Sequence, residues 1–167
     1  MRKLEVFFDY SCPFCLKGHE YLKELLPRYT DIEIVWRPCE AHPRPENYGL
    51  HSDLCIQGMF YALEQDADIW DYHKRMYDAA LIEHLNIEDP EAVAAAVLGM
   101  LDTDAFLKVL QSDKYEKAVT DSNDYAYEQS SVWAIPSYRM EGRKLDSELG
   151  VGITKEQLAA FLETRTL

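Results

Sequence analysis

The feature that constrains this chain most is a pair of cysteines, three positions apart, that directly follows an apolar segment. Residues 3–9 are rich in Val and Phe and predict a central strand that is buried on both faces. Cys12 and Cys15 come next, and Pro13 between them suits the first turn of a helix, where a missing N–H costs nothing. A thiol at a helix start lies among unpaired backbone N–H groups, which favour the thiolate. Strand, cysteine pair and helix in this order favour redox chemistry.

The two sulfurs are predicted to have different roles. Cys12 is expected to be the exposed attacking sulfur, and Cys15, one turn further into the helix, the buried sulfur that resolves a mixed disulfide. Cys-x-x-Cys is also half of a structural zinc site, but such a site needs four ligands and the sequence has no second pair of this kind. We therefore predict a redox pair and no metal.

Size and charge exclude several classes of function. The chain has 167 residues, enough for one domain that carries an insertion. Its net charge is −13, from 30 acidic and 17 basic residues, and such a surface repels phosphate backbones and anionic lipid. We expect no nucleic-acid and no membrane partner. The sequence shows no signal-peptide core and no long apolar run, so we expect a cytoplasmic protein, in which cysteines serve chemistry or packing.

The first half of the pattern predicts a βαβ unit. The helix after the cysteine pair places Cys15, His19, Leu22 and Leu26 on one stripe and is expected to end near Pro27. Ile32–Trp36 reads as the second strand, which in a right-handed βαβ unit is parallel to the first.

A Pro-rich loop that reaches Gly49 is followed by about eighty residues with helical periodicity. Asn86 can end one of these helices, and Asp89 with Pro90 can open the next, as N-cap and first-turn proline. The apolar positions of the first two helices define two faces. These are Leu54, Cys55, Gly58, Met59 and Ala62, and then Ile69, Tyr72, His73, Met76, Tyr77 and Ala80.

The last segment returns to strands. Ala134–Met140 and Lys144–Leu149 can pair as an antiparallel hairpin about a turn at Glu141–Gly142, and Thr154 to Gln157 forms a capping box that opens a final helix. The order βαβ, helical block, ββα predicts an α/β protein with a thioredoxin fold that carries an all-helical insertion between its halves. The expected parts are residues 1–49, 50–130 and 131–167.

Two segments of this chain resemble a known family. Asp9–Cys15 is similar to the Asp-x-x-Cys-Pro-aromatic-Cys motif of the DsbA-like branch of the thioredoxin superfamily, and Val132–Tyr138 is similar to its Val-x-Gly-Val-Pro-Thr-Phe segment. Within that branch the chain resembles the cytoplasmic FrnE-type oxidoreductases. From the residues alone, Pro136 can be cis or can be a trans proline at a strand start.

The resemblance implies a substrate platform. It makes the Ile135–Pro136 bond a cis peptide beside Cys12, leaves the Ile135 backbone free to pair with an extended substrate, and places Pro13 and Phe14 at the same surface. It also implies that disulfides of proteins or small molecules are the substrates.

Departures from the family pattern bear on the direction of the reaction. Ser131 and Ala134 stand where the family often has Gly, so the backbone there must be less extreme or locally strained. Phe14 replaces the His that periplasmic relatives carry between the cysteines, and Val6 replaces an acid that many of them have. Cys12 should therefore be less acidic and its disulfide less oxidising. This favours a reductase or isomerase over an oxidase.

Two further residues are candidate modulators. Asp9 can orient water near the motif or can only solvate the strand end, and its charge would oppose the thiolate. His19 is four residues after Cys15 on the same helical face, so it can relay a proton to the resolving sulfur or can be a histidine hydrogen-bonded at the edge of the core.

A second group of cysteines and histidines leaves three interpretations open. Cys39, His42, His51 and Cys55 have a spacing that could chelate zinc, and Cys39 could form a disulfide with Cys55. Cys55 also falls on the apolar stripe with Leu54 and Met59, and buried packing explains it adequately.

The predicted function is a thiol-disulfide oxidoreductase that needs no cofactor and uses the Cys-Pro-Phe-Cys dithiol. The alternative is a glutathione-dependent enzyme, since such folds are also similar to kappa-class glutathione transferases and 2-hydroxychromene-2-carboxylate isomerases, in which a Ser replaces the first cysteine. Glutathione would then be a co-substrate. The presence of both Cys12 and Cys15 counts against this alternative. A third possibility is a non-enzymatic module that binds a metal or a partner.

Overall fold

A four-stranded mixed sheet lies at the centre of the protein, whose computed structural model describes residues 1–165. Strand β1 (Arg2–Phe8) pairs in parallel with β2 (Ile32–Pro38) and antiparallel with β3 (Ser137–Met140), and β3 pairs antiparallel with β4 (Arg143–Asp146). The strand order is β2-β1-β3-β4. The predicted parallel pair and the predicted hairpin are both confirmed.

The helices follow the predicted order, with a helical block between the two halves of the sheet. None of the helices in residues 1–165 combines the length and the apolar character that crossing a bilayer requires. The helical elements are α1 (Pro13–Leu25), η1 (Leu26–Arg28), α2 (Asp53–Glu64), α3 (Ile69–Tyr77), η2 (Asp78–Ile82), α4 (Pro90–Ala96), α5 (Thr103–Gln111), α6 (Glu116–Asp124), η3 (Tyr125–Gln129) and α7 (Lys155–Glu163).

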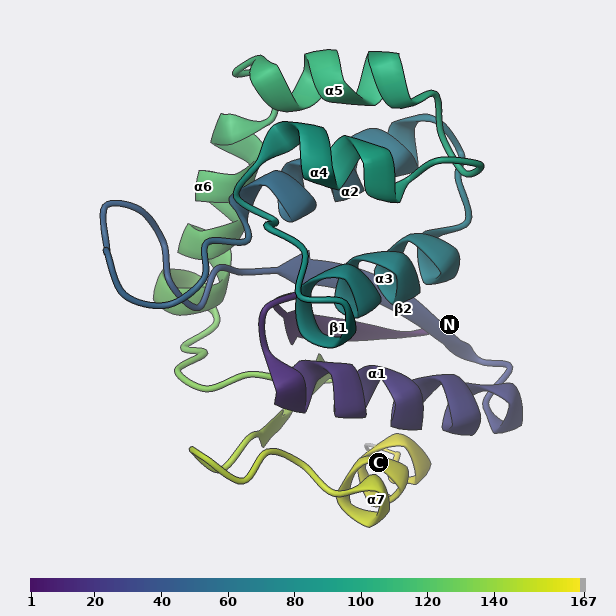
Figure 1. Ribbon diagram of the computed structural model, residues 1–167. Helices are drawn as coiled ribbons and strands as arrows, with labels where there is room; N and C mark the ends of the chain where they lie inside the picture. Colours follow the sequence, from purple (N-terminus) through teal and green to yellow (C-terminus); the bar gives the residue numbers. More distant parts are fainter. Residues whose placement is uncertain (166–167) are drawn as a thin grey trace.

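Figure 1 shows how these helices are divided about the sheet. Helices α1 and α7 lie together in the lower part of the view, and α2, α4 and α5 are stacked in the upper part, with α6 descending beside them. The predicted ranges 1–49, 50–130 and 131–167 stay predictions, and the final two positions of the last range lie outside the described residues.

Strand β1 is buried on both faces only at its carboxyl end. Val6, Phe7 and Phe8 are all buried, whereas Lys3 is exposed. The prediction for the whole segment is therefore wrong at the amino end. There the face that carries Lys3 opens onto a groove, because the η3 segment around Tyr125 does not cover it.

Helix α1 buries the predicted stripe with one exception. Its buried residues include Cys15, His19 and Leu22, but Leu25 and not Leu26 completes the stripe. Leu26 is half-buried, because the chain tightens at this point into the 3-10 turn η1, which contains Pro27.

Local capping signals proved reliable. Asp89 caps α4 by accepting a hydrogen bond from the N–H of Glu91, and Thr154 caps α7 in a complete capping box with Gln157. The two-residue turn at Glu141 and Gly142 has φ of 53° and 75°, the left-handed values that a tight hairpin needs.

The last two strands are shorter than predicted. β3 begins at Ser137 and not at Ala134, because Pro136 has no N–H to extend the ladder. β4 ends at Asp146 and not at Leu149. The next residue, Ser147, donates from its hydroxyl to the carbonyl of Pro136, and the chain then leaves the sheet.

The second predicted helix of the block ends in an irregular segment. Helix α3 runs on into the five-residue π-helical segment η2, and the chain leaves the helical conformation at Glu83, before the predicted stop at Asn86. The last part of the predicted helical block is present as α6 followed by the π-helical segment η3.

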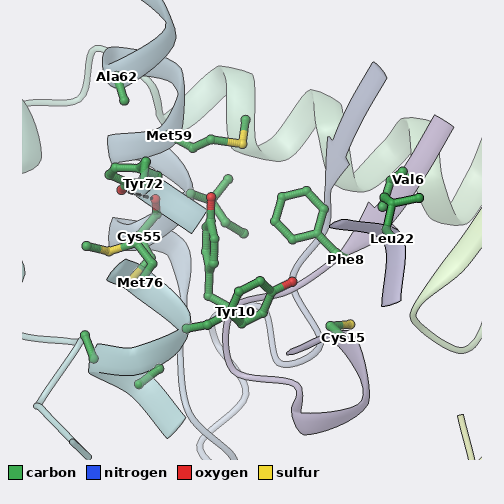
Figure 2. Close-up of a cluster of buried hydrophobic side chains, with 14 of the residues drawn as sticks. Val6, Phe8, Tyr10, Cys15, Leu22, Cys55, Met59, Ala62, Tyr72 and Met76 are labelled. Atoms are coloured by element: carbon green, nitrogen blue, oxygen red, sulfur yellow. Dashed lines mark hydrogen bonds between the residues drawn. The ribbon is translucent and has the colours of Figure 1, made fainter. Parts of the chain in front are cut away.

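A continuous core joins the sheet to the helical block. Figure 2 shows Tyr10, from the loop between β1 and α1, lying between Cys15 on one side and Cys55, Tyr72 and Met76 on the other. The Tyr72 hydroxyl donates to the carbonyl oxygen of Cys55 at 2.7 Å, which ties α3 to α2. The start of α1 is thus held against a core built from both parts of the chain.

Candidate active site

Cys12 lies at the point where the chain enters α1. It is the N-cap residue, with extended φ and ψ of −100° and 114°, and its Sγ accepts a hydrogen bond from the N–H of Cys15 at 3.3 Å. The same thiol donates to the carbonyl oxygen of Ile135 at 3.7 Å. The sulfur therefore lies between the amino end of α1 and the loop that precedes β3.

The surroundings of Cys12 favour its thiolate. Hydrogen bonds from the Cys15 thiol and then from the Cys15 backbone lower the pKa of Cys12 below its usual value, although partial burial opposes this shift. The side chain is only partly buried, so a disulfide can reach it. These are the properties expected of an attacking sulfur.

Cys15 has the opposite environment. It is 1% exposed, and burial raises the pKa of its thiol well above the usual value, with a further increase from its hydrogen bond to Cys12. All four cysteines are free thiols in this structure. The partly exposed Cys12 and the buried Cys15 agree with the predicted roles of attacking and resolving sulfur. The roles themselves stay a prediction.

The Ile135–Pro136 peptide bond is cis, and Pro136 packs against α1. A Cβ atom added at Gly18 would lie 3.1 Å from Pro136 Cγ and 2.6 Å from the Tyr138 hydroxyl oxygen. Glycine at position 18 therefore allows the proline loop to approach the helix that carries Cys12 and Cys15. Sequence analysis missed Gly18, although a lone glycine inside a helical pattern is a known sign of close packing.

Hydrogen bonds brace the loop on both sides of Pro136. Ser137 donates from its hydroxyl to the carbonyl of Ala134 at 2.6 Å, and Arg139 donates to the carbonyl of Ser130 at 3.2 Å. Ser131 has φ of +55°, a left-handed value that strains residues other than glycine. Of the two predicted possibilities, a less extreme backbone or a strained one, the strained one is correct at Ser131. The carbonyl of Ile135 is thereby held in a fixed position opposite Cys12.

Large apolar side chains are exposed on the motif, on the loop before β3 and on the loop after β4. Phe14 is 39% exposed, and a Cβ added at Gly152 would lie 2.9 Å from its ring, so the loop after β4 packs against the motif. Pro13 is exposed as well. Four large exposed residues from the motif, the loop before β3 and the loop after β4 form what we call the apolar rim. They are Phe14, Trp133, Leu149 and Val151.

Asp9 is fully buried, so the interpretation that it solvates the strand end is wrong. Its carboxylate accepts hydrogen bonds from the Ser11 N–H at 3.2 Å, the Ser11 hydroxyl at 3.0 Å and the Ala41 N–H at 2.7 Å. Burial raises the pKa of Asp9. Its negative charge in turn raises the pKa of Cys12 and of Cys15, the opposition to the thiolate that the sequence indicated.

His19 lies at the edge of an aromatic cluster and not on the surface. It is 9% exposed, and its ring centroid is 5.1 Å from that of Trp70 and 5.3 Å from that of Tyr77. Burial, with a smaller contribution from Lys23, lowers the pKa of His19 to about 4. The ring is therefore neutral at physiological pH, and its predicted part in proton transfer stays open.

The residues of the zinc alternative are not brought together. Cys55 lies in the main core, and Cys39 lies in a separate small cluster with Phe7, Ala126 and Val132. The His51 ring bonds through Nδ1 to the carbonyl of His42 at 2.8 Å. Among residues 1–165, no group of three or more histidine, cysteine or acidic side chains is placed to hold a metal ion.

Comparison with known proteins identifies relatives along the whole chain. A family model described as a DSBA-like thioredoxin domain matches residues 3–163. The uncharacterized protein YwbO of Bacillus subtilis is 24% identical over 172 residues, a match that covers 81% of this chain and 84% of that protein.

Solved structures show the same architecture. A probable DsbA oxidoreductase from Streptomyces coelicolor has a TM-score of 0.81 at 14% identity, covering 100% of this chain and 93% of that one. DsbA from Chlamydia trachomatis has a TM-score of 0.74 at 12% identity, covering 96% and 84%. The predicted DsbA-like thioredoxin fold is confirmed, whereas the FrnE-type branch stays a prediction.

Proposed function

Because the chain belongs to the DSBA-like thioredoxin domain family, we propose that it is a thiol-disulfide oxidoreductase with Cys12 as its nucleophile. One observation carries this proposal. The Cys12 sulfur is the N-cap of α1, accepts the Cys15 N–H at 3.3 Å and lies 3.7 Å from the carbonyl oxygen of Ile135. An activated sulfur, a second sulfur within reach and a backbone acceptor for a substrate chain are therefore present at one place.

The reaction has two exchange steps. The Cys12 thiolate attacks one sulfur of a substrate disulfide, a mixed disulfide forms, and the other substrate sulfur leaves as a thiolate. Cys15 then loses its proton and attacks Cys12 Sγ, which breaks the mixed disulfide and releases the second substrate thiolate. Two electrons pass from the dithiol to the substrate, and the two substrate thiolates take up protons.

The loop before β3 supports a protein substrate. The carbonyl of Ile135, a half-buried residue, can accept a main-chain hydrogen bond from an extended segment laid beside Cys12. The apolar rim lies on the motif and on the loops before β3 and after β4, and we propose that it contacts apolar side chains on either side of the substrate cysteine. We propose that the substrates are disulfides in extended, apolar protein segments.

The direction we propose is reduction or isomerisation in a reducing compartment, as in FrnE-type enzymes. Phe14 places an apolar ring where a cationic residue would stabilise the Cys12 thiolate, and the buried charge of Asp9 partly opposes the hydrogen bonds from Cys15 that lower the pKa of Cys12. A less stable thiolate makes the disulfide easier to form and so a weaker oxidant.

The test compares single-cysteine variants in the reduction of insulin by dithiothreitol. Cys12→Ser should abolish the accelerated precipitation of insulin chains, and Cys15→Ser should accumulate a covalent mixed disulfide visible on a non-reducing gel. Cys55→Ala is the matched control, because it removes a buried thiol outside the motif and should keep the activity. Wild-type turnover by Cys12→Ser would refute the proposal.

A redox titration in glutathione buffers decides the direction. A potential below the cytosolic glutathione poise, roughly −220 to −320 mV by different methods, supports a reductase, and a potential well above it supports an oxidase or an isomerase. If a single glutathione adduct on Cys12 accumulates and no Cys12–Cys15 disulfide forms, the glutathione-dependent alternative replaces the dithiol mechanism.

A further inference from the structure

A small internal cavity lies next to the resolving sulfur. Its volume is ≈ 10 Å³, about the space that one water molecule needs, and it is formed where α1, β1, β2, α3 and β3 meet. Cys15, His19 and His73 all line it, and Pro136 closes it toward the substrate platform. Two imidazoles therefore share an enclosed space with the thiol that must lose a proton.

His73, one of the residues that line the cavity, has an unpaired ring nitrogen. The side chain is 1% exposed, and its Nδ1 atom bonds to the hydroxyl of Tyr10 at 2.8 Å. Its Nε2 atom is buried and has no hydrogen-bond partner within residues 1–165. Buried polar atoms are nearly always paired, and an ordered water is the usual partner where protein atoms supply none.

His19 connects the same cavity to the outside. Its ring centroid is 5.6 Å from that of His73, and the side chain keeps 9% of its surface exposed at the edge of the core. A proton that reaches His19 therefore has a short route to solvent, whereas a proton held on His73 has none.

The other groups around the cavity are the alternatives to His19 as proton acceptor. Among the described residues that line the cavity there is no carboxylate, and β1 contributes Val6 and Phe8 to its wall. The other ionisable groups close to the cavity are the phenols of Tyr77 and Tyr138 on its wall, Tyr10 beyond His73, Lys23 near His19, and Cys12 and Asp9 near Cys15. Burial raises the pKa of Tyr77, so it stays a neutral phenol.

We propose that this cavity is a water site, oriented by His73, through which Cys15 passes its proton to His19 during resolution of the mixed disulfide. The inference rests on the proposed function and concerns its second step alone. The Cys15 S–H proton moves to the water while a water proton moves to a ring nitrogen of His19. The Cys15 thiolate bonds to Cys12 Sγ, and the bond from Cys12 to the substrate sulfur breaks, leaving a substrate thiolate.

This exchange avoids a net charge in the buried site. Transfer from Cys15 to His19 creates a thiolate and an imidazolium together, and the pair attracts each other across the low-dielectric cavity. The thiolate then loses its charge as the new disulfide forms, and His19 returns its proton to solvent. His73 is a positioning residue, because it acts on the water and not on either sulfur.

The experiment separates the two exchange steps by stopped flow. Reduced protein is mixed with Ellman's reagent, so that attack by Cys12 releases one thionitrobenzoate and attack by Cys15 releases the second. His73→Phe and His19→Phe should leave the first release unchanged and slow the second on the order of 100-fold, the usual effect of losing acid–base assistance. The second release should also become proportional to hydroxide concentration, because hydroxide must then take the proton.

Control variants make the outcome decisive. Tyr10→Phe removes the hydroxyl bonded to Nδ1 but keeps His73 Nε2, so its second release should fall less than that of His73→Phe. If His73→Phe does not fold, His19→Phe at the cavity edge tests the same step. An unchanged second release, or an equal slowing of both releases, in His19→Phe would overturn the relay. Loss of the first release in wild-type protein would instead refute the proposed function.

Discussion

The Sγ atom of Cys12 lies 3.7 Å from the carbonyl oxygen of Ile135, a residue 123 positions later in the chain. The contact exists because β3 pairs with β1, with Tyr138 opposite Val6, and this pairing carries the loop before β3 to the start of α1. The proposed nucleophile and the proposed substrate acceptor, far apart in the sequence, thus meet at the carboxyl end of one strand.

The charge on Asp9 opposes the hydrogen bonds from Cys15 that lower the pKa of Cys12. Asp9 raises the pKa of Cys12, so Asp9→Asn should lower that pKa and move the pH midpoint of alkylation by iodoacetamide downward. Peptide mass analysis after timed alkylation between pH 5 and 9 measures the midpoint. Ser11→Ala is the matched control, since it removes one hydrogen bond to Asp9 but keeps the charge. An unchanged or higher midpoint in Asp9→Asn would contradict this account.

Two glycines of the loop after β4 test the support of Phe14. Both Gly150 and Gly152 have left-handed φ, of 76° and 84°, so alanine at either site should cost about 1 kcal/mol of unfolding free energy. Only at Gly152 would the new Cβ meet the Phe14 ring, and at Gly150 no atom lies within 4 Å. Gly152→Ala should therefore raise KM for insulin as well, and Gly150→Ala should not. Equal KM values for the two variants would show that Phe14 does not contact substrate.

Gly18→Ala should separate stability from activity. Alanine favours the helix by about 1 kcal/mol, but its Cβ would overlap the Tyr138 hydroxyl and crowd Pro136, at a cost of about 1–3 kcal/mol. The net change in unfolding free energy is small, whereas Pro136 must move away from the helix that carries Cys12. Urea unfolding and insulin reduction measured together check this, with Lys17→Ala as an exposed control on the same helix. Full activity in Gly18→Ala would show that the loop position is not critical.

The burial of His19 predicts an acid-sensitive fold. Its pKa is about 4 when folded and near 6.5 when exposed, so the unfolded chain binds the proton first as the pH falls. This group alone should therefore lower the unfolding free energy by about 2 kcal/mol between pH 6.5 and 5.

Urea unfolding at pH 7, 6 and 5 measures this effect as a difference between wild type and His19→Phe. The phenylalanine variant keeps a ring in the aromatic cluster but cannot take up a proton, so its stability should fall less with acid. Parallel pH dependences in the two proteins would mean that His19 does not titrate below its usual range.

Local patterns predicted most of the fold. The N-caps Asp89 and Thr154, the turn at Glu141 and the buried stripe of α1 each depend on residues within a few positions of one another. The structure has them all, except that Leu25 replaces Leu26 in the stripe. The predicted strand start at Ala134 and strand end at Leu149 are wrong, because the alternation of apolar and polar residues does not show where the neighbouring strand ends.

The environment of the site could not be read from neighbouring residues. Asp9 can be buried because its carboxylate oxygens accept hydrogen bonds from Ser11 and from the backbone N–H of Ala41. Ala41 lies in the loop after β2, far from Asp9 in the sequence. The cavity beside Cys15 depends on His73 from α3 and Trp36 from β2. Contacts of this kind are set by tertiary packing, and helical spacing alone placed His73 only on an inward face.

The strand order also fixes when this protein acquires its chemistry during synthesis. Cys12 and Cys15 leave the ribosome before the helical block, but β3, the neighbour of β1, and the Ile135 carbonyl are made only after the whole of that block. A nascent chain therefore carries both thiols before the loop that faces Cys12 exists. Both sulfurs depend on the reducing state of their surroundings until β3 has emerged.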